Sequence, residues 1–263
     1  MKRSYLTTKF SKVFVLFILC LMGSALNAQN DSLTQNTRYS GHMLLTAGYA
    51  KPLEDIASRS TFGSAKHGVG LQFLFQIPLS KRFGLCAAYD RAWFYVDEDE
   101  LFKRSSTYSS PQTSGEMSSV SVNQNWIVNG LNIGGFASFP LSQNQKINFE
   151  TRLMFGASFA SSPGFSCTYA TFSPSLSAVS YKTESLFSSK SSNVPVTFLL
   201  GLGLRINLDP DWCLALNFDY LNVLQETEFD EVEIRNTLNQ TSTTTKNMDL
   251  GYYTFKLGIG RFF

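Results

Sequence analysis

The last eight residues, Lys256 to Phe263, read KLGIGRFF and are the clearest guide to the fold. Large apolar side chains recur at every second position from Phe255 to Ile259 and again at Phe263, while the intervening positions as far as Gly260 hold lysine or glycine. A period of two is that of a β-strand whose two faces differ in chemistry. The stretch therefore predicts a strand with one apolar face and one face that is small or charged.

Seven earlier stretches show the same alternation, so the chain carries eight strand signals in all. In the second and sixth stretches the alternate residues are almost all Val, Leu, Ile or Phe, and glycine or polar residues stand at most of the positions between them. The predicted strands are Tyr39–Ala50, His67–Leu79, Phe83–Val96, Val120–Leu141, Lys146–Ala160, Asn193–Leu208, Trp212–Leu224 and Leu250–Phe263.

The fourth of these stretches changes phase along its length. Trp126 and Val128 stand at even positions, whereas the later apolar residues, from Leu131 to Leu141, stand at odd positions. One extra residue in a strand shifts its register by one. We therefore expect a β-bulge near Asn129 and Gly130 that restores a single apolar face.

The connections between the predicted strands are alternately short and long. The short ones are residues 80–82, 142–145 and 209–211, and the long ones are residues 51–66, 97–119, 161–192 and 225–249. Strictly alternating lengths are typical of a membrane barrel, with short periplasmic turns and long extracellular loops. The sequence thus predicts an all-β fold, an eight-stranded antiparallel up-and-down transmembrane β-barrel.

The two faces of the strands differ sharply in charge. The apolar faces are nearly uncharged, with Arg91 and Arg261 near opposite rims where long side chains can reach lipid headgroups. The other faces carry three acids and three bases that can neutralise one another inside a narrow barrel. We expect these six residues to form a structural, ion-paired network: Asp90, Glu150, Arg152, Arg205, Asp219 and Lys256. A proton or ion path is the alternative role, and a lipocalin-like barrel with its apolar face inside is the alternative arrangement.

The N-terminus predicts export. Four basic residues precede an apolar run at residues 13–22, and small residues follow at 25–28, as in a secretory signal peptide. We expect residues 1–28 to be removed, residues 29–38 to be a flexible periplasmic lead-in and residues 39–263 to form the barrel. Loss of four basic residues changes the formal net charge from +2 to −2, so the charge gives no reason to expect a nucleic-acid partner.

The C-terminal strand resembles the sorting and assembly strand of Gram-negative outer-membrane β-barrels. Lys256, Gly258 and Phe263 match that pattern, and Arg261 stands where the family has an apolar residue. Over residues 39–263 the chain resembles small barrels of the OmpA and OmpX type. The resemblance implies the cell outer membrane, periplasmic termini and extracellular loops. It also implies contact with outer-membrane lipid and lipopolysaccharide, and recognition of the last strand by the barrel-assembly machinery.

Few residues suggest chemistry. His67, with Ser64 nearby at the predicted outer rim, is the one candidate for a hydrolase, because His42 is expected deep in the periplasmic half. Acidic residues cluster at 97–100 and 226–233 without the spacing of a known calcium loop. Cys86 and Cys213 fall on opposite walls of the barrel, beyond disulfide reach. With Cys167 they make an odd number after cleavage, so complete pairing is excluded and we expect them to be wall-packing residues. We predict no catalytic, cofactor or metal site.

The long connections carry the functional expectation. Residues 227–235 and 241–248 alternate and are rich in Thr, Val, Ile and Phe, which predicts a hairpin that turns near residues 236–240. The connection 161–192 is Ser-rich with scattered aromatic residues, and we expect an irregular surface loop. We expect a non-enzymatic barrel that displays its loops for adhesion, envelope integrity or contact with a protein partner. The alternatives are an accessory barrel of an export machine (PorT-like), a conduit for small hydrophobic solutes of the OmpW type, and a lipid-modifying enzyme.

Overall fold

The computed structural model describes residues 41–57, 64–99, 115–122, 124–144, 146–173, 178–187, 191–235 and 240–263. The predicted signal peptide and lead-in lie outside the described residues. No helix among the described residues is long and apolar enough to cross a membrane.

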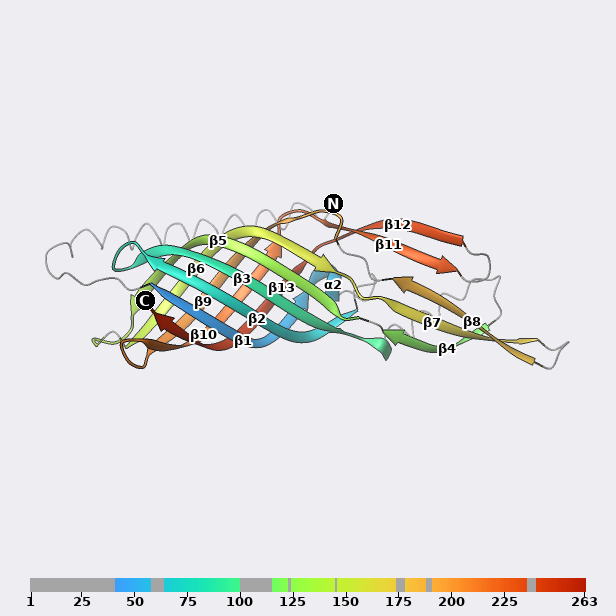
Figure 1. Ribbon diagram of the computed structural model, residues 1–263, viewed down its shortest axis with the longest axis horizontal. Helices are drawn as coiled ribbons and strands as arrows, with labels where there is room; N and C mark the ends of the chain where they lie inside the picture. The colour runs from blue at the N-terminus through green and yellow to red at the C-terminus, as the bar shows by residue number, and fades with distance from the viewer. Residues whose placement is uncertain are drawn as a thin grey trace. The chain divides into compact units, whose positions relative to one another are not determined.

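Eight strands close into one antiparallel barrel, as predicted (Figure 1). The neighbours around the barrel are β1-β13-β10-β9-β6-β5-β3-β2, and the first and last strands pair from His42↔Phe262 to Leu53↔Gly251. Closure leaves no free edge among these strands. Their bounds are β1 His42–Leu53, β2 Ala65–Pro78, β3 Phe83–Val96, β5 Trp126–Pro140, β6 Ile147–Ser161, β9 Val196–Asn207, β10 Trp212–Val223 and β13 Gly251–Phe262.

A second sheet of five strands is built from the long connections. Its order is β12-β11-β8-β7-β4, and its members come from the connections that follow β3, β6 and β10. The bounds are β4 Gly115–Val122, β7 Phe165–Ser173, β8 Ala178–Phe187, β11 Thr227–Arg235 and β12 Gln240–Met248, while the connection after β1 holds the short helix α2, Glu54–Ala57. The predicted hairpin at 227–248 is confirmed. The prediction that 161–192 is irregular is wrong, because β7 and β8 form a second hairpin within it.

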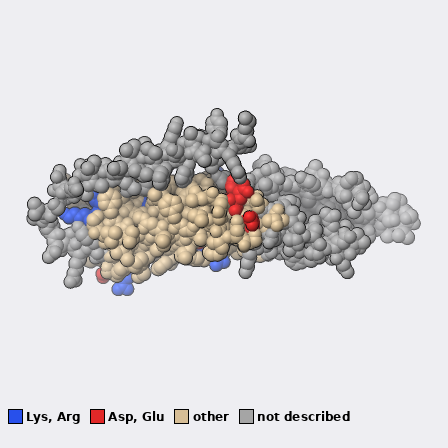
Figure 2. Space-filling view, turned by 90° about the horizontal axis from the view of Figure 1, so that it is seen from above, with Lys and Arg blue, Asp and Glu red and all other residues tan. Residues whose placement is uncertain are grey.

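The apolar faces of the barrel strands point outward. Leu131, Ile133 and Leu257 are 60–68% exposed, whereas Thr46 and Gln72 on the opposite faces are at most 1% exposed. Figure 2 shows a barrel face on which charged side chains occupy only small areas. The expected exterior is therefore confirmed, and the lipocalin-like arrangement is excluded.

The predicted β-bulge in the fourth stretch is wrong. β5 pairs with β3 in unbroken register from Phe94↔Trp126 to Phe83↔Ala137. The phase change has two causes: β4 and β5 are separate strands, and Trp126 and Val128 point into the barrel, where both are buried. Apolar residues on the inner face of β5 were therefore misread as part of its outer face.

Candidate functional site

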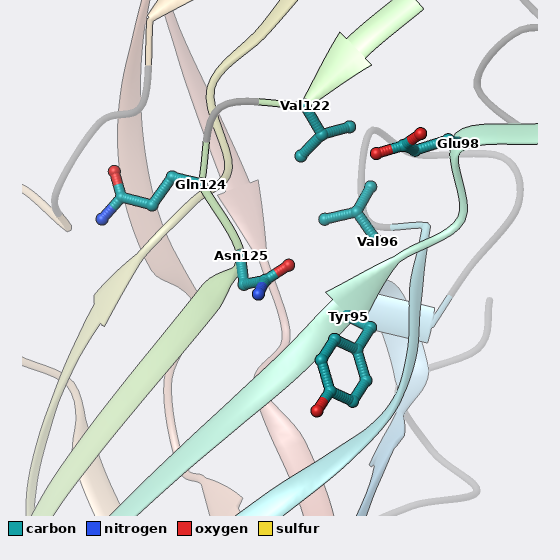
Figure 3. A pocket seen from close by; sticks show the side chains of 6 residues that line it. All are labelled: Tyr95, Val96, Glu98, Val122, Gln124 and Asn125. Atoms are coloured by element: carbon teal, nitrogen blue, oxygen red, sulfur yellow. The ribbon is translucent and has the colours of Figure 1, made fainter.

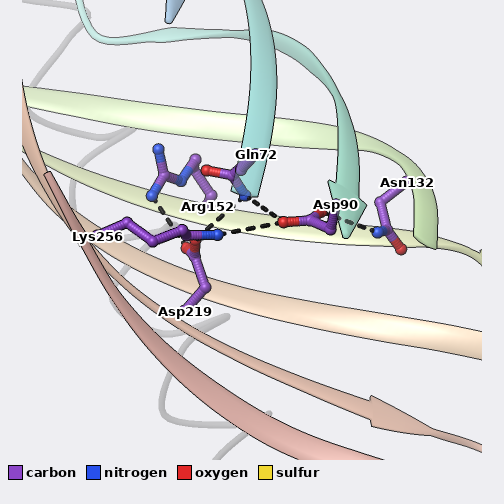
Figure 4. Close-up of polar contacts among 6 residues, drawn as sticks. All are labelled: Gln72, Asp90, Asn132, Arg152, Asp219 and Lys256. Carbon is purple, nitrogen blue, oxygen red and sulfur yellow. Dashed lines mark hydrogen bonds and ion pairs between the residues drawn. The ribbon is translucent and has the colours of Figure 1, made fainter. Parts of the chain in front are cut away.

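A network of buried charged and polar side chains crosses the barrel interior. Its centre is Lys256 on β13, whose Nζ lies 3.2 Å from Asp90 Oδ1 and 2.9 Å from Asp219 Oδ2 (Figure 4). Asp90 comes from β3 and Asp219 from β10, so one ammonium joins three strands that are far apart in the sequence. We call this network the belt.

The belt extends through four more strands. Arg152 Nη2 on β6 donates to Asp219 Oδ1 at 3.0 Å, and Gln72 Nε2 on β2 donates to both aspartates at 2.8 and 3.1 Å. Asn132 Nδ2 on β5 donates to Asp90 Oδ2 at 3.4 Å and accepts at Oδ1 from Thr197 Oγ1 of β9 at 2.9 Å. Every barrel strand except β1 therefore contributes a side chain to one connected set of contacts.

Glu150, which is buried, and Arg205, which is partly exposed, form a separate ion pair. Arg205 Nε donates to Glu150 Oε1 at 2.7 Å, and its Nη1 donates to Asn207 Oδ1 at 3.3 Å. The guanidinium also lies 5.3 Å from the centroid of the Phe262 ring. The six residues expected to form a charge network thus lie in two groups, four in the belt and two in this pair.

Burial makes these contacts energetically important. The side chains of Arg152, Asp219, Asp90 and Lys256 are at most 5% exposed. Removing one partner of a buried pair leaves an uncompensated charge in a medium of low dielectric constant. The contact between Arg152 and Asp219 also depends on a glycine. A Cβ at Gly201 would lie 2.5 Å from Asp219 Oδ1 and 2.7 Å from Arg152 Nε, so a larger residue would displace one of them.

Large rings fill the barrel interior at the end that carries the long connections. Phe94 on β3 meets Tyr252 on β13 edge-on at 5.5 Å, and Trp126 on β5 meets Phe229 on β11 at the same distance. All four residues are at most 3% exposed. These rings fill the barrel interior between the belt and the long connections. Their packing therefore favours a structural role for the belt over a path for ions.

The residues of the predicted assembly signal lie along the closing seam of the barrel. Lys256 belongs to the belt, and a Cβ at Gly258 would overlap the backbone of β1 at Leu45. Phe263 stacks on Phe75 at 5.3 Å, and its backbone N–H donates to Gly41 O at 3.0 Å.

The hydrolase candidate is not assembled. His67 lies on the outer face between Tyr49, with which it stacks at 6.0 Å, and Tyr95, which it meets edge-on at 6.1 Å. Ser64 Oγ is buried and has no hydrogen-bond partner within the described residues. His42 is buried inside the barrel beside Phe136 and Phe262. Among the described residues, no three His, Cys, Asp or Glu side chains are grouped to hold a metal ion.

Two cysteines and one residue of the acidic cluster at 97–100 have contacts that fit a structural role. Cys86 and Cys213 are buried free thiols on β3 and β10, four strands apart around the barrel, as expected. The Cys167 side chain lies outside the described part of the structure. Asp97 of the acidic cluster forms an ion pair with Lys66 at 3.0 Å.

A small open pocket of about 220 Å³ lies where β3 ends and β5 begins (Figure 3). Its lining mixes two valines with amide, carboxylate and phenol groups. The lining residues are Tyr95, Val96, Glu98, Val122, Gln124 and Asn125. Figure 3 shows Gln124 and Tyr95 directed away from the centre, so their polar groups do not converge on one point.

Sequence reasoning found the charges but missed most of their partners. Gln72 is one of the polar residues between the apolar positions of the second stretch, but nothing in its spacing linked it to Asp90 or Asp219. The sequence likewise did not predict that Asn132 and Thr197 join the same network. The available signal was the occurrence of polar residues at similar heights on neighbouring inner faces, which becomes usable only when strand register is known.

An apolar exterior around a buried, ion-paired interior defines the class of transmembrane β-barrels. No family model matches the chain, and no curated protein matches it. Among solved structures it is similar to Neisserial surface protein A (10% identity, TM-score 0.46, 85% of this chain and 97% of the other). It is also similar to a major outer membrane protein of Thermus thermophilus (14%, 0.45, 85% and 98%) and to the Escherichia coli outer membrane protease OmpT (10%, 0.35, 88% and 99%).

Proposed function

We propose that this chain is an outer-membrane barrel that presents the five-stranded sheet outside the cell as a docking platform for a protein partner. The observation that carries the proposal is the assembly of strands from three separate connections into a single sheet. Loops that serve only to join barrel strands have no need of a shared sheet. Periplasmic termini, a cleaved leader at residues 1–28 and a flexible lead-in at 29–38 belong to the same proposal.

The docking site is the edge of the sheet at β12, beside which no other described strand pairs. β12 pairs with β11 over nine positions in unbroken register, from Thr227↔Met248 to Arg235↔Gln240, and lies at the end of the sheet order. The other edge strand, β4, has a register shift between Met117 and Ser119. Irregular edges resist pairing with another strand, and the register of β4 is interrupted whereas that of β12 is not. The occupant is an extended segment of another protein, which adds a strand beside β12 through main-chain hydrogen bonds.

Site-specific crosslinking on intact cells tests this proposal. A photoreactive residue placed singly at Thr243, Thr244 or Thr245 of β12 should yield one defined adduct. The matched control is Ser185 on β8, which pairs with Ile234 of β11 on one side and with Ser166 of β7 on the other, so no adduct should form there. Adducts at Ser185 equal to those on β12, or none on β12, would overturn the docking site.

The C-terminal strand has a second proposed role in assembly. Lys256, Gly258 and Phe263 serve as the signal that the barrel-assembly machinery recognises, and the same strand then closes the barrel against β1. The support is the position of all three residues along the β1–β13 seam.

A further inference from the structure

Negative charge is concentrated on β11, the strand next to the proposed docking edge. Over residues 227–233, β11 carries four acids and no base, and the β12 positions opposite, residues 242–248, hold one base. The formal net charge of this paired stretch is therefore −3, one base minus four acids. The acids are Glu228, Asp230, Glu231 and Glu233, and the base is Lys246.

The other side of this stretch gains no base from a described strand. β8 pairs with β11 only from Val232 to Arg235, and an isolated bridge joins Ser191 to Phe229. Glu228 is exposed and forms no ion pair with any described residue. By register, the described strands thus leave the negative charge of β11 largely uncompensated.

A strand added at β12 would lie within electrostatic range of these acids. Neighbouring strands are about 4.8 Å apart, so the added strand would be about 10 Å from β11. That distance is close to the Debye length of about 8 Å at physiological ionic strength. Residues 241–245 of β12, which lie between the two strands, are all Thr or Ser and therefore short. A basic strand is consequently attracted to this edge and an acidic strand is repelled.

The sheet also indicates the direction of the added strand. All the pairings within it are antiparallel, and antiparallel pairs are slightly more stable per residue than parallel ones. β12 runs toward the barrel, because it ends at Met248 and barrel strand β13 begins at Gly251. An antiparallel neighbour of β12 therefore runs away from the barrel.

We propose that the segment bound at β12 is a basic strand, rich in lysine or arginine, that runs antiparallel to β12 and away from the barrel. The inference rests on the proposed docking site and specifies the chemistry of its partner. Main-chain hydrogen bonds to β12 hold the strand, and the acids of β11 select its charge. Glu228 and Asp230 occupy positions on one face of β11, and Glu231 and Glu233 occupy positions on the other, so a basic residue on either face of the bound strand is matched by an acid.

Peptide binding to the full chain in phosphatidylcholine vesicles, whose lipids carry no net charge, tests the charge of the partner. The probes are three fluorescent peptides of 9 residues, the length of β12, in which threonine alternates with lysine, glutamine or glutamate. At about 0.1 M salt, where the Debye length is about 10 Å, the lysine peptide should bind about tenfold more tightly than the glutamine peptide, and the glutamate peptide should bind least. At about 1 M salt, where the Debye length is about 3 Å, the three should bind equally.

The variant Glu228→Gln, Glu231→Gln removes one acid from each face of β11. At the lower salt concentration it should reduce the preference for the lysine peptide to about threefold or less. The matched control is Glu98→Gln, Asp99→Asn, which removes the same number of acids from the connection after β3. The control should keep the full preference.

A photoreactive group on the lysine peptide reports the direction of binding. Placed at the peptide N-terminus it should crosslink near Asn247, and placed at the C-terminus it should crosslink near Thr241, as mapped by mass spectrometry. The reverse pattern would overturn the antiparallel direction. Equal binding of the lysine and glutamine peptides at the lower salt concentration, or an equal loss of preference in the control variant, would overturn the basic partner.

The docking site is scored separately from the charge of its partner. If glutamine and lysine peptides carrying the photoreactive group crosslink to β12 equally well, the docking site stands and the basic partner is wrong. If no peptide crosslinks to β12, both proposals are wrong.

Discussion

At the scale of single residues, Lys256 holds two carboxylates together in the barrel interior. Asp90 and Asp219 share its ammonium, and no second lysine contacts either of them among the described residues. Like charges at short range are mutually destabilising without a cation between them. The position of Lys256 therefore matters more for stability than that of an exposed lysine.

We predict that Lys256→Gln lowers the free energy of unfolding by about 3–5 kcal/mol, because it leaves a buried acid uncompensated. Unfolding by urea in phosphatidylcholine vesicles measures the change. Lys146→Gln, in an exposed turn, should change it by less than about 0.5 kcal/mol.

Adding Asp90→Asn to Lys256→Gln should restore part of the stability. The double variant keeps the Arg152–Asp219 pair and leaves the belt neutral. A double-mutant cycle should therefore give a coupling of about 1–3 kcal/mol. Strict additivity of the two changes would contradict the belt as a coupled unit.

We predict that the thiols of Cys86 and Cys213 are unreactive in the folded barrel, since both are buried at 5% and 0% exposure. In a Cys167→Ser background, a maleimide reagent should modify neither thiol before unfolding and both afterwards. A fast-labelling thiol in the folded protein, or a disulfide on a non-reducing gel, would contradict their buried, free state.

At the scale of elements, the packing of Trp126 on Phe229 links barrel strand β5 to β11 of the second sheet. We predict that Trp126→Ala lowers the free energy of unfolding by about 3–5 kcal/mol and makes the β11–β12 hairpin more sensitive to protease. Limited proteolysis with mapping of cuts in residues 227–248 measures the second effect. Trp212→Ala, 41% exposed near the opposite rim, should leave the cleavage pattern unchanged.

The last strand offers a test that separates recognition from stability. We predict that Phe263→Ala lowers the yield of assembled barrel in cells several-fold, while the purified variant still refolds in vesicles. Phe263 is 59% exposed, so its loss removes little buried area. Equal yields in cells, or failure to refold in vesicles, would show that Phe263 is not an assembly signal separate from stability.

The strands that sequence analysis located best are those with one period throughout. β3 was predicted with its observed bounds, Phe83–Val96, because its alternation is clean and short turns or acidic residues flank it. β5 was misread because its inner face turns apolar near Trp126, so the period alone cannot tell lipid from a buried ring. The β7–β8 hairpin was missed because Ser-rich strands lack the apolar signal on which period analysis depends.

At the scale of the whole molecule, the closure of the barrel and the choice of which strand faces look inward followed from the sequence, but the partners of the buried charges did not. The alternation of short and long connections indicates which strands are neighbours. The number of charged residues on each strand face indicates which face looks inward. The partners of Asp90, Asp219 and Lys256 depend on the stagger of eight strands around the barrel. That quantity is set by register across every pair of strands at once.

The central claim is that the apolar exterior of the barrel lies in lipid. The most direct test places a nitroxide spin label singly at Leu131, Ile133 and Leu257 outside, and at Ala88 inside, in outer membranes isolated from cells that make the full chain. The account predicts that the three outside labels collide with oxygen dissolved in lipid and not with a water-soluble nickel complex, while the inside label meets neither. Outside labels that collide freely with the nickel complex would show that the exterior faces water, and the membrane-barrel account would be wrong.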